Sequence, residues 1–179
     1  MLVAGTGELD FQYYRTQILG LAENEKIDLM FSDLGINDIY PYGATDTSIN
    51  NIVNNAKKLI DAFLIDNPTG KWAVCYPKSR SSAFTSSGRL HYPMRFDMQR
   101  LRERILEEFD FNANYPNVYV CGSGMQIDRW FGYPLAERNV ASRIEIAETK
   151  PSDDVHPSDA GYQQVGDAMT ATAWYSLNQ

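Results

Sequence analysis

The sequence predicts one α/β domain organised around a parallel sheet. Short apolar runs of strand length alternate along the chain with longer segments whose apolar residues recur at helical spacing. This alternation is typical of βαβ units, in which helices cover a parallel sheet. A length of 179 residues suits a single domain, and we assign residues 1–179 to it.

Three apolar runs are predicted to form the strands of this sheet: Lys26–Leu34, Trp72–Tyr76 and Asn117–Cys121. Three segments have helical periodicity: residues 47–66 with Thr47 as the N-cap, Phe96–Phe109 and Ser158–Leu177. Two long stretches between these elements, Lys78–Arg95 and Gln126–Val155, have neither pattern and are predicted to be irregular.

The charge balance argues against some classes of partner. Acidic residues outnumber basic ones by 23 to 16, which gives a net charge of −7. We expect no binding to nucleic acid, because phosphate recognition requires a basic surface. No apolar run reaches the roughly 18–20 residues that cross a bilayer. Residues 1–5 lack the features of a signal peptide, so the sequence does not indicate the compartment. If the protein is secreted or part of a virion, its targeting signal lies elsewhere.

Two cysteines, Cys75 and Cys121, end two of the predicted strands. Two cysteines cannot build a disulfide framework, and we expect both to be buried free thiols. A single bridge between them would require that their strands be neighbours. No spacing of cysteines and histidines indicates a metal site.

Two short motifs carry side chains with catalytic chemistry. Gly35-Ile36-Asn37-Asp38 directly follows the first predicted strand, and Asp153-Asp154-Val155-His156-Pro157 precedes the last helix. A carboxylate three residues before a histidine can accept the proton on Nδ1, which leaves Nε2 free to act as a general base. An asparagine amide at the end of a strand can donate to a developing oxyanion. Each motif alone is also compatible with an ordinary turn.

In combination and in this order, the two motifs resemble the third and fifth sequence blocks of the SGNH hydrolases, also called GDSL esterases. The third block, Gly-x-Asn-Asp, is matched by Gly35, Asn37 and Asp38, and the fifth, Asp-x-x-His, by Asp153 and His156. The stretch from Asn117 to Pro134, which contains Gln126-Ile127-Asp128-Arg129, is also loosely similar to SGNH domains of phage tail proteins and of gut bacteria. The resemblance implies a three-layer α/β/α sandwich with a flavodoxin-like parallel sheet.

The resemblance also implies a set of catalytic roles. His156 would act as the base and Asp153 would orient it, with Asp154 as the alternative carboxylate. The side chain of Asn37 and the backbone N–H of Gly7 would form the oxyanion hole. Gly7 precedes Asn37 at a spacing similar to that of the family's second block, and Gly5 is the competing choice. The implied reaction is ester hydrolysis without cofactor or metal, with an O-acetyl group on a carbohydrate as the substrate class.

The chain departs from the family at the nucleophile. The family's first block, Gly-Asp-Ser, occurs nowhere in the sequence, so we expect no nucleophilic serine in this chain. Three explanations stay open: a larger polypeptide of which this is the C-terminal part, a natural remnant or split-gene product, and recruitment of another residue. Ser123, between Gly122 and Gly124, is the best candidate for recruitment, and Thr6 is a weaker one.

The same departure has a structural consequence. Without the strands that carry the first block, the strand at Lys26–Leu34 becomes an edge with unpaired backbone groups. Asp33 interrupts its apolar run and needs either solvent at the strand end or a partner. We therefore expect the chain to associate with another copy, or to take the missing N-terminal segment from a partner chain.

The sequence thus predicts a serine esterase domain without its nucleophile, inactive on its own. The alternative is a non-catalytic structural or glycan-binding module of a phage-tail-like or cell-surface protein. His91, in the serine-rich loop, and Tyr40 and Tyr42, after the Asn-Asp turn, are weaker candidates for substrate contacts and are equally compatible with ordinary loop positions. Asp128 and Arg129 are predicted to pair with each other and so brace their loop, and they are given no chemistry.

Overall fold

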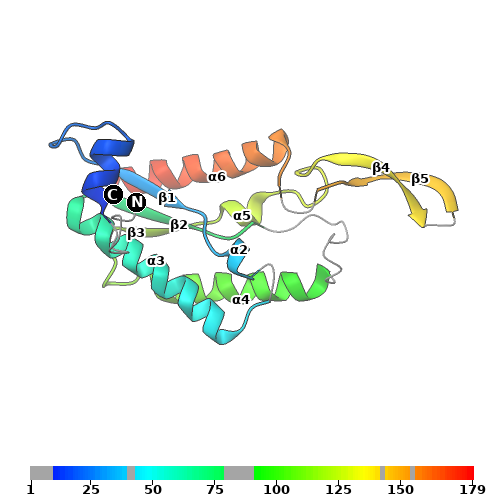
Figure 1. Cartoon of the computed structure of the whole chain (residues 1–179), viewed down its shortest axis with the longest axis horizontal. Coiled ribbons are helices and arrows are strands. Elements are labelled where there is room, and N and C mark those ends of the chain that lie inside the picture. The colour runs from blue at the N-terminus through cyan, green and yellow to red at the C-terminus, as the bar shows by residue number, and fades with distance from the viewer. Residues whose placement is uncertain (1–9, 40–42, 79–90, 142–143, 154–155) are drawn as a thin grey trace.

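The computed structural model describes residues 10–39, 43–78, 91–141, 144–153 and 156–179. Its central sheet has three parallel strands in the order β1 (Leu29–Ser32), β2 (Lys71–Cys75) and β3 (Val118–Cys121). Helices cover both faces, with α3 (Asp46–Asp66) and α4 (His91–Phe109) on one side and α6 (Asp159–Leu177) on the other (Figure 1). The predicted three-layer α/β sandwich with a parallel sheet is confirmed.

Short helical segments complete the body of the domain: α1 (Phe11–Tyr13), the π-helical turn η1 (Tyr14–Ile18), α2 (Ile36–Ile39) and α5 (Ser123–Gln126). The α2 helix follows β1 and α5 follows β3, so both lie where strands of the sheet end (Figure 1). In the part of the chain that the structure describes, no helix has both the length and the apolar character needed to cross a membrane.

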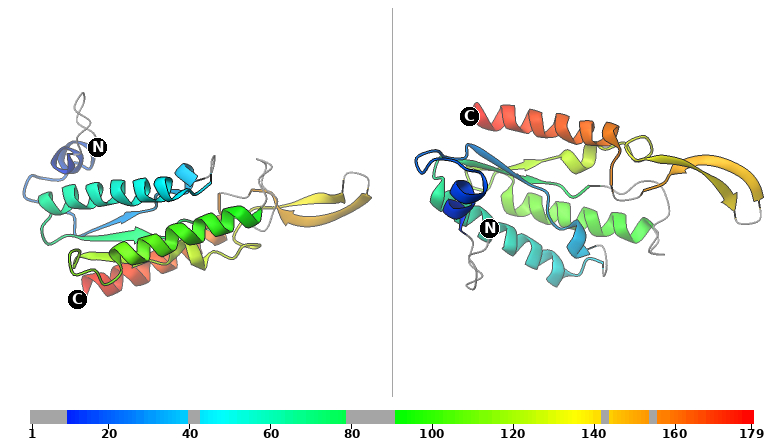
Figure 2. Two further views of the ribbon diagram at one scale, coloured as in Figure 1. Left: turned by 90° about the horizontal axis from the view of Figure 1, so that it is seen from below. Right: turned by 45° about the horizontal axis from the view of Figure 1, so that its top comes forward.

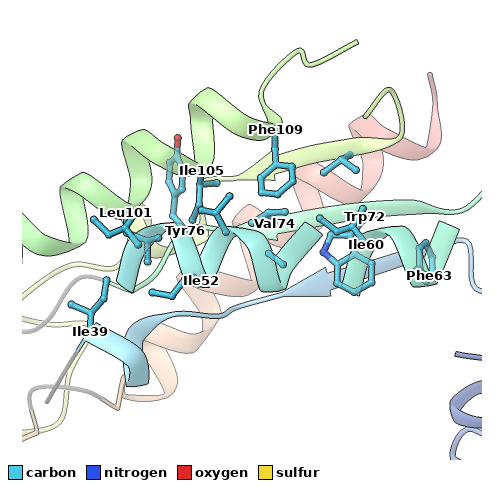
Figure 3. Packing of buried hydrophobic residues seen from close by; sticks show 14 of the residues in the cluster. Ile39, Ile52, Ile60, Phe63, Trp72, Val74, Tyr76, Leu101, Ile105 and Phe109 are labelled. Atoms are coloured by element: carbon cyan, nitrogen blue, oxygen red, sulfur yellow. The ribbon is translucent and has the colours of Figure 1, made fainter. Parts of the chain in front are cut away.

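The main core lies between the sheet and the α3–α4 layer. The buried residues of α3 recur at helical spacing, as the sequence predicts: Ile49, Ile52, Val53, Ala56, Ile60 and Phe63. They meet side chains from α4 and from β2, as Figure 3 shows for Leu101, Ile105 and Trp72. The rings of Phe63 and Trp72 pack edge to face with their centroids 5.2 Å apart.

The opposite face of the sheet carries smaller buried side chains. Ala73, Cys75 and Cys121 form a second apolar cluster, against which Met169 of α6 packs. Cys75 and Cys121 are partners in the β2–β3 register, and both are buried free thiols, as predicted. Small side chains on this face allow α6 to approach the sheet.

The ends of three predicted elements need correction. Thr45, not Thr47, caps α3: its hydroxyl accepts the N–H of Ser48 at 3.0 Å, and the Ser48 hydroxyl accepts the N–H of Thr45 at 2.9 Å. The first strand is shorter than Lys26–Leu34, because it ends before the charged Asp33. The α4 helix begins at His91 rather than at Phe96.

The early start of α4 removes His91 from the predicted loop. Pro93 falls in the first helical turn, where backbone N–H groups have no partner within the helix, so a proline is tolerated there. Most of the rest of that predicted loop, residues 79–90, lies outside the described residues.

The prediction that Gln126–Val155 is irregular was wrong. This stretch contains an antiparallel hairpin of β4 (Leu135–Ala141) and β5 (Ile144–Pro151), with an irregularity in register between Asn139 and Ala141. The hairpin projects from the body of the domain in every view (Figure 1, Figure 2). Because its strands are rich in charged residues, their alternation was hard to recognise in the sequence.

The first strand of the described sheet pairs with β2 on one side only, and β1 is therefore an edge of the sheet as described. Asp33 lies just beyond the end of β1, where its carboxylate contacts the ammonium group of Lys78. The position past the strand end and the lysine together explain why an acidic residue is tolerated in this apolar run.

A buried arginine attaches the segment before β1 to the end of α3. The Arg15 guanidinium is almost fully buried; it donates to Asp66 at 3.0 Å and to the backbone oxygens of Ala22, Glu23 and Glu25. Burial raises the pKa of Asp66, but the hydrogen bond and charge of Arg15, aided by Lys26, outweigh this effect and hold the pKa below its usual 3.8.

Replacing Asp66 should reduce stability in a pH-dependent way. We expect Asp66→Asn to cost about 2 kcal/mol or more at pH 7, since it leaves a buried guanidinium without its counter-charge. A depressed carboxyl pKa stabilises the fold above the pKa of the unfolded state and ceases to do so as pH falls through the folded-state value. The difference between wild type and variant in urea unfolding should therefore shrink on acidification. The exposed Asp167→Asn should show no such trend.

A second prediction concerns the α3 side of the core. Ile60 is fully buried, whereas Ile65 of the same helix is 82% exposed. We expect Ile60→Ala to lower the free energy of unfolding by about 2–5 kcal/mol through lost burial and a cavity. Ile65→Ala should change it by no more than about 0.5 kcal/mol. Equal effects of the two substitutions in urea unfolding would contradict the packing described here.

Candidate functional site

Both sequence motifs lie at the carboxyl end of the sheet. The first continues directly from β1 into α2, and the second comes immediately before α6 (Figure 1). The α5 helix, after β3, lies at the same end (Figure 1). Loops at the carboxyl ends of parallel strands are where binding sites of α/β proteins are usually found.

The Asp153 carboxylate holds His156 through both of its oxygens. Oδ1 accepts the backbone N–H of His156 at 2.9 Å, and Oδ2 lies 3.0 Å from the ring Nδ1. The imidazole is 76% exposed. A carboxylate on Nδ1 favours the tautomer with its proton on that nitrogen, so Nε2 is left as an accessible proton acceptor.

The turn that carries this pair is held at both ends by a neighbouring segment. The carbonyl of Pro134 accepts from the backbone N–H of Ser152 at 2.6 Å and from its hydroxyl at 3.0 Å. The carbonyl of Gly132 accepts the N–H of Ser158 at 2.9 Å. Ser158 also caps α6 by accepting the N–H of Gly161. We call the turn between these contacts, with Asp153 and His156, the histidine turn.

A second turn, residues 128–132, is fixed by an aspartate. Oδ1 of Asp128 accepts the backbone N–H groups of Trp130 and Phe131, each at 2.8 Å, and these bonds lower the pKa of Asp128. The N–H of Asp128 donates to Oε1 of Gln164 on α6 at 2.7 Å. We call this segment the aromatic turn. Asp128 thus braces its loop, here through backbone amides.

The predicted oxyanion residues are placed only in part. Asn37 occupies α2, while Gly7 and its alternative Gly5 lie outside the described residues, as does Asp154. Gly35, before α2, has a φ of 102°, and a Cβ there would lie 2.8 Å from a methyl group of Leu101. Both constraints favour glycine at this position, so the connection between β1 and α2 requires a glycine there.

Ser123, the candidate for a recruited nucleophile, is buried at the start of α5. It lies against the thiols of Cys75 and Cys121, whose mutual hydrogen bond raises the pKa of Cys75 and lowers that of Cys121 to about 6. A buried hydroxyl is poorly placed for attack on a substrate that approaches from solvent. Thr6, Tyr40 and Tyr42 lie outside the described residues, and His91 begins α4.

Sequence reasoning missed Trp130 and Phe131, whose backbone N–H groups donate to Asp128, and Gln164, which accepts the N–H of Asp128. An aspartate two and three residues before two aromatic residues was the available signal, because that spacing suits a side chain that accepts consecutive backbone N–H groups. Within the described residues, no group of three or more His, Cys, Asp or Glu could hold a metal ion.

A solved structure resembles most of this chain. It is the structure of "a putative platelet activating factor" from Streptococcus pneumonia, with a TM-score of 0.61 and 15% sequence identity over 92% of this chain and 68% of that chain. The two proteins share their fold. No protein-family model matches the sequence, and no curated protein matches it either. The likeness supports the α/β arrangement with a parallel sheet flanked by helices.

The close approach of the two turns yields a prediction at Gly161. A Cβ at this position would lie 2.1 Å from the backbone oxygen of Gly132, whereas one at Gly166, also in α6, would meet nothing within 4 Å. We expect Gly161→Ala to destabilise the protein by about 1–3 kcal/mol, because the backbone must shift. Gly166→Ala should stabilise it by up to about 1 kcal/mol through helix propensity.

Thermal unfolding followed by circular dichroism measures both variants. Amide hydrogen exchange of the histidine turn should accelerate in Gly161→Ala and stay unchanged in Gly166→Ala. If Gly161→Ala is as stable as wild type, with unchanged exchange, the tight contact with Gly132 does not hold the turn.

Proposed function

We propose that this chain supplies the acid–base and oxyanion side of an SGNH-type serine ester hydrolase. The observation that carries the proposal is the Asp153–His156 pair, with the ring Nδ1 3.0 Å from the carboxylate and the imidazole exposed at the carboxyl end of the sheet. The shared fold of the solved structure is consistent with it. The motif in α2 that contains Asn37 belongs to the same end of the sheet.

The proposed reaction follows from these groups. Nε2 of His156 takes the proton of a serine hydroxyl as the serine oxygen attacks the ester carbonyl carbon. The negative oxygen that forms accepts hydrogen bonds from the Asn37 amide and the N–H of Gly7. His156 then gives its proton to the leaving alcohol, and water releases the acyl group from serine by the same steps. Asp153 orients the imidazole and stabilises it while it is protonated.

The serine has to come from a segment that carries a Gly-Asp-Ser block, because this sequence contains none. The unpaired outer side of β1 in the described sheet is where such a segment would add its strand. The substrate class that we propose, an O-acetyl ester on a carbohydrate, rests on the family resemblance. The partners are then the ester substrate and the segment with the serine, or a second copy of the chain.

The second candidate function is a non-catalytic glycan-binding or structural module, as in a tail-like assembly. The absence of Gly-Asp-Ser from the sequence and the burial of Ser123 favour it. In that case the histidine turn would be present, but the protein would not catalyse ester hydrolysis.

An esterase assay separates the two functions. The 179-residue chain should hydrolyse p-nitrophenyl acetate no faster than its His156→Ala variant. When the chain is joined to an N-terminal segment with a Gly-Asp-Ser strand, hydrolysis should appear. In that fusion His156→Ala should lower kcat/KM by about 10³-fold or more, since the general base is lost. Asp159→Asn, an exposed acidic residue at the start of α6, is the matched control and should leave the rate unchanged.

Three outcomes would count against the proposal. Hydrolysis by the fusion that survives His156→Ala would remove this residue from the reaction. Hydrolysis by the chain alone that is lost in Ser123→Ala would identify a recruited serine instead. A fusion that folds, as judged by circular dichroism and a single unfolding transition, yet shows no hydrolysis would favour the non-catalytic module.

A further inference from the structure

The aromatic turn presents two large apolar side chains to solvent. Trp130 is 37% exposed and Phe131 is 68% exposed. Exposed aromatic side chains contribute little to the stability of the fold, and adjacent ones at the surface often mark a place of contact with another molecule. Their backbone is nevertheless fixed, since both N–H groups donate to Asp128. The backbone that carries the two aromatic side chains is thus held in place before any ligand binds.

The aromatic turn is joined directly to the residues that follow His156. The backbone oxygen of Gly132 accepts the N–H of Ser158 at 2.9 Å, and that of Phe131 lies 3.4 Å from the Ser158 hydroxyl. Glycine at position 161 of α6 allows this approach, because a Cβ there would lie 2.1 Å from the backbone oxygen of Gly132. A Cβ at Gly132 would lie 2.4 Å from the backbone oxygen of Asp128 in its own turn. The backbone of the aromatic turn therefore lies against Ser158, two residues after His156.

We propose that Trp130 and Phe131 form a platform on which a pyranose ring of the substrate stacks while its ester group lies at His156. This inference rests on the proposed function and specifies its substrate class further. A sugar ring has an apolar C–H face that packs on an aromatic side chain, and hydroxyl groups that stay in contact with water or with polar groups.

The openness of the platform favours a carbohydrate over a fatty acyl chain. An acyl chain is stabilised by an enclosed apolar site, whereas Phe131 keeps most of its surface in water. The aromatic turn also has polar groups of its own: the Asp128 carboxylate, which accepts its backbone N–H groups, and Gln164 of α6, which accepts the N–H of Asp128. Such groups suit hydroxyls and do not suit a hydrocarbon tail.

Affinity electrophoresis tests the platform without any need for turnover. The intact 179-residue chain is run in native gels that contain O-acetylated xylan, deacetylated xylan or no polysaccharide. Wild type should be retarded by xylan, and Trp130→Ala and Phe131→Ala should each raise the apparent Kd about tenfold or more, as expected for aromatic residues at the centre of a contact. The matched controls are Trp174→Ala and Phe111→Ala, which remove rings of the same kind that are more exposed and lie elsewhere.

The controls lie far from the platform. Trp174 is near the end of α6, on the order of 20 Å along the helix from Ser158, and Phe111 follows the end of α4. Both should bind xylan as wild type does. His156→Ala should also bind normally, so that loss of binding and loss of catalysis are separate results.

Several results would overturn the platform. These are no retardation of the wild type by either xylan, retardation unchanged in both Trp130→Ala and Phe131→Ala, or an equal loss in the Trp174 and Phe111 variants. Strong binding to p-nitrophenyl palmitate micelles that depends on Trp130, without binding to xylan, would assign the platform to an acyl chain. If the fusion described above shows no esterase activity while xylan binding still depends on Trp130, the proposed hydrolysis fails and the carbohydrate contact stands.

Discussion

The two hydrogen bonds between Asp153 and His156 are the interaction on which the functional interpretation depends. The backbone bond closes the turn, and the ring bond orients the imidazole within it. An exposed histidine without such a partner would rotate freely and could serve neither as a positioned base nor as a proton donor. The carboxylate converts a surface side chain into an oriented group with a defined free nitrogen.

The position of the histidine turn is fixed by hydrogen bonds to a neighbouring segment of the chain. Pro134 and Gly132 accept hydrogen bonds from Ser152 and Ser158, so one segment fixes both ends of the turn. That segment is in turn fastened to α6 through Gln164 and Asp128. A pair of side chains supported in this way moves with the helix and not with the loop. Phe131 belongs to the same segment, and its backbone oxygen lies 3.4 Å from the Ser158 hydroxyl.

Much of this architecture could be predicted from the sequence, because apolar periodicity reports burial. The six buried residues of α3 and the apolar runs of β2 and β3 follow from that pattern. Boundaries set by capping were less predictable: Thr45 and Thr47 are equivalent in propensity, and only the reciprocal bond with Ser48 selects the first. The β4–β5 hairpin was missed because it lies outside the core, where strands do not need an apolar face.

The candidate site also has a part that could be predicted from the sequence and a part that could not. Asp153 and His156 could be recognised because a short local spacing determines their contact. The contacts among residues 128–134, Ser158 and Gln164 join segments that are distant in sequence. Most of them involve backbone groups, which do not require a particular residue type except at Gly132 and Gly161. Gly161, where a Cβ would meet the backbone oxygen of Gly132, and Gly132, where a Cβ would meet that of Asp128, are therefore the residue types that reflect how the aromatic turn packs against the start of α6.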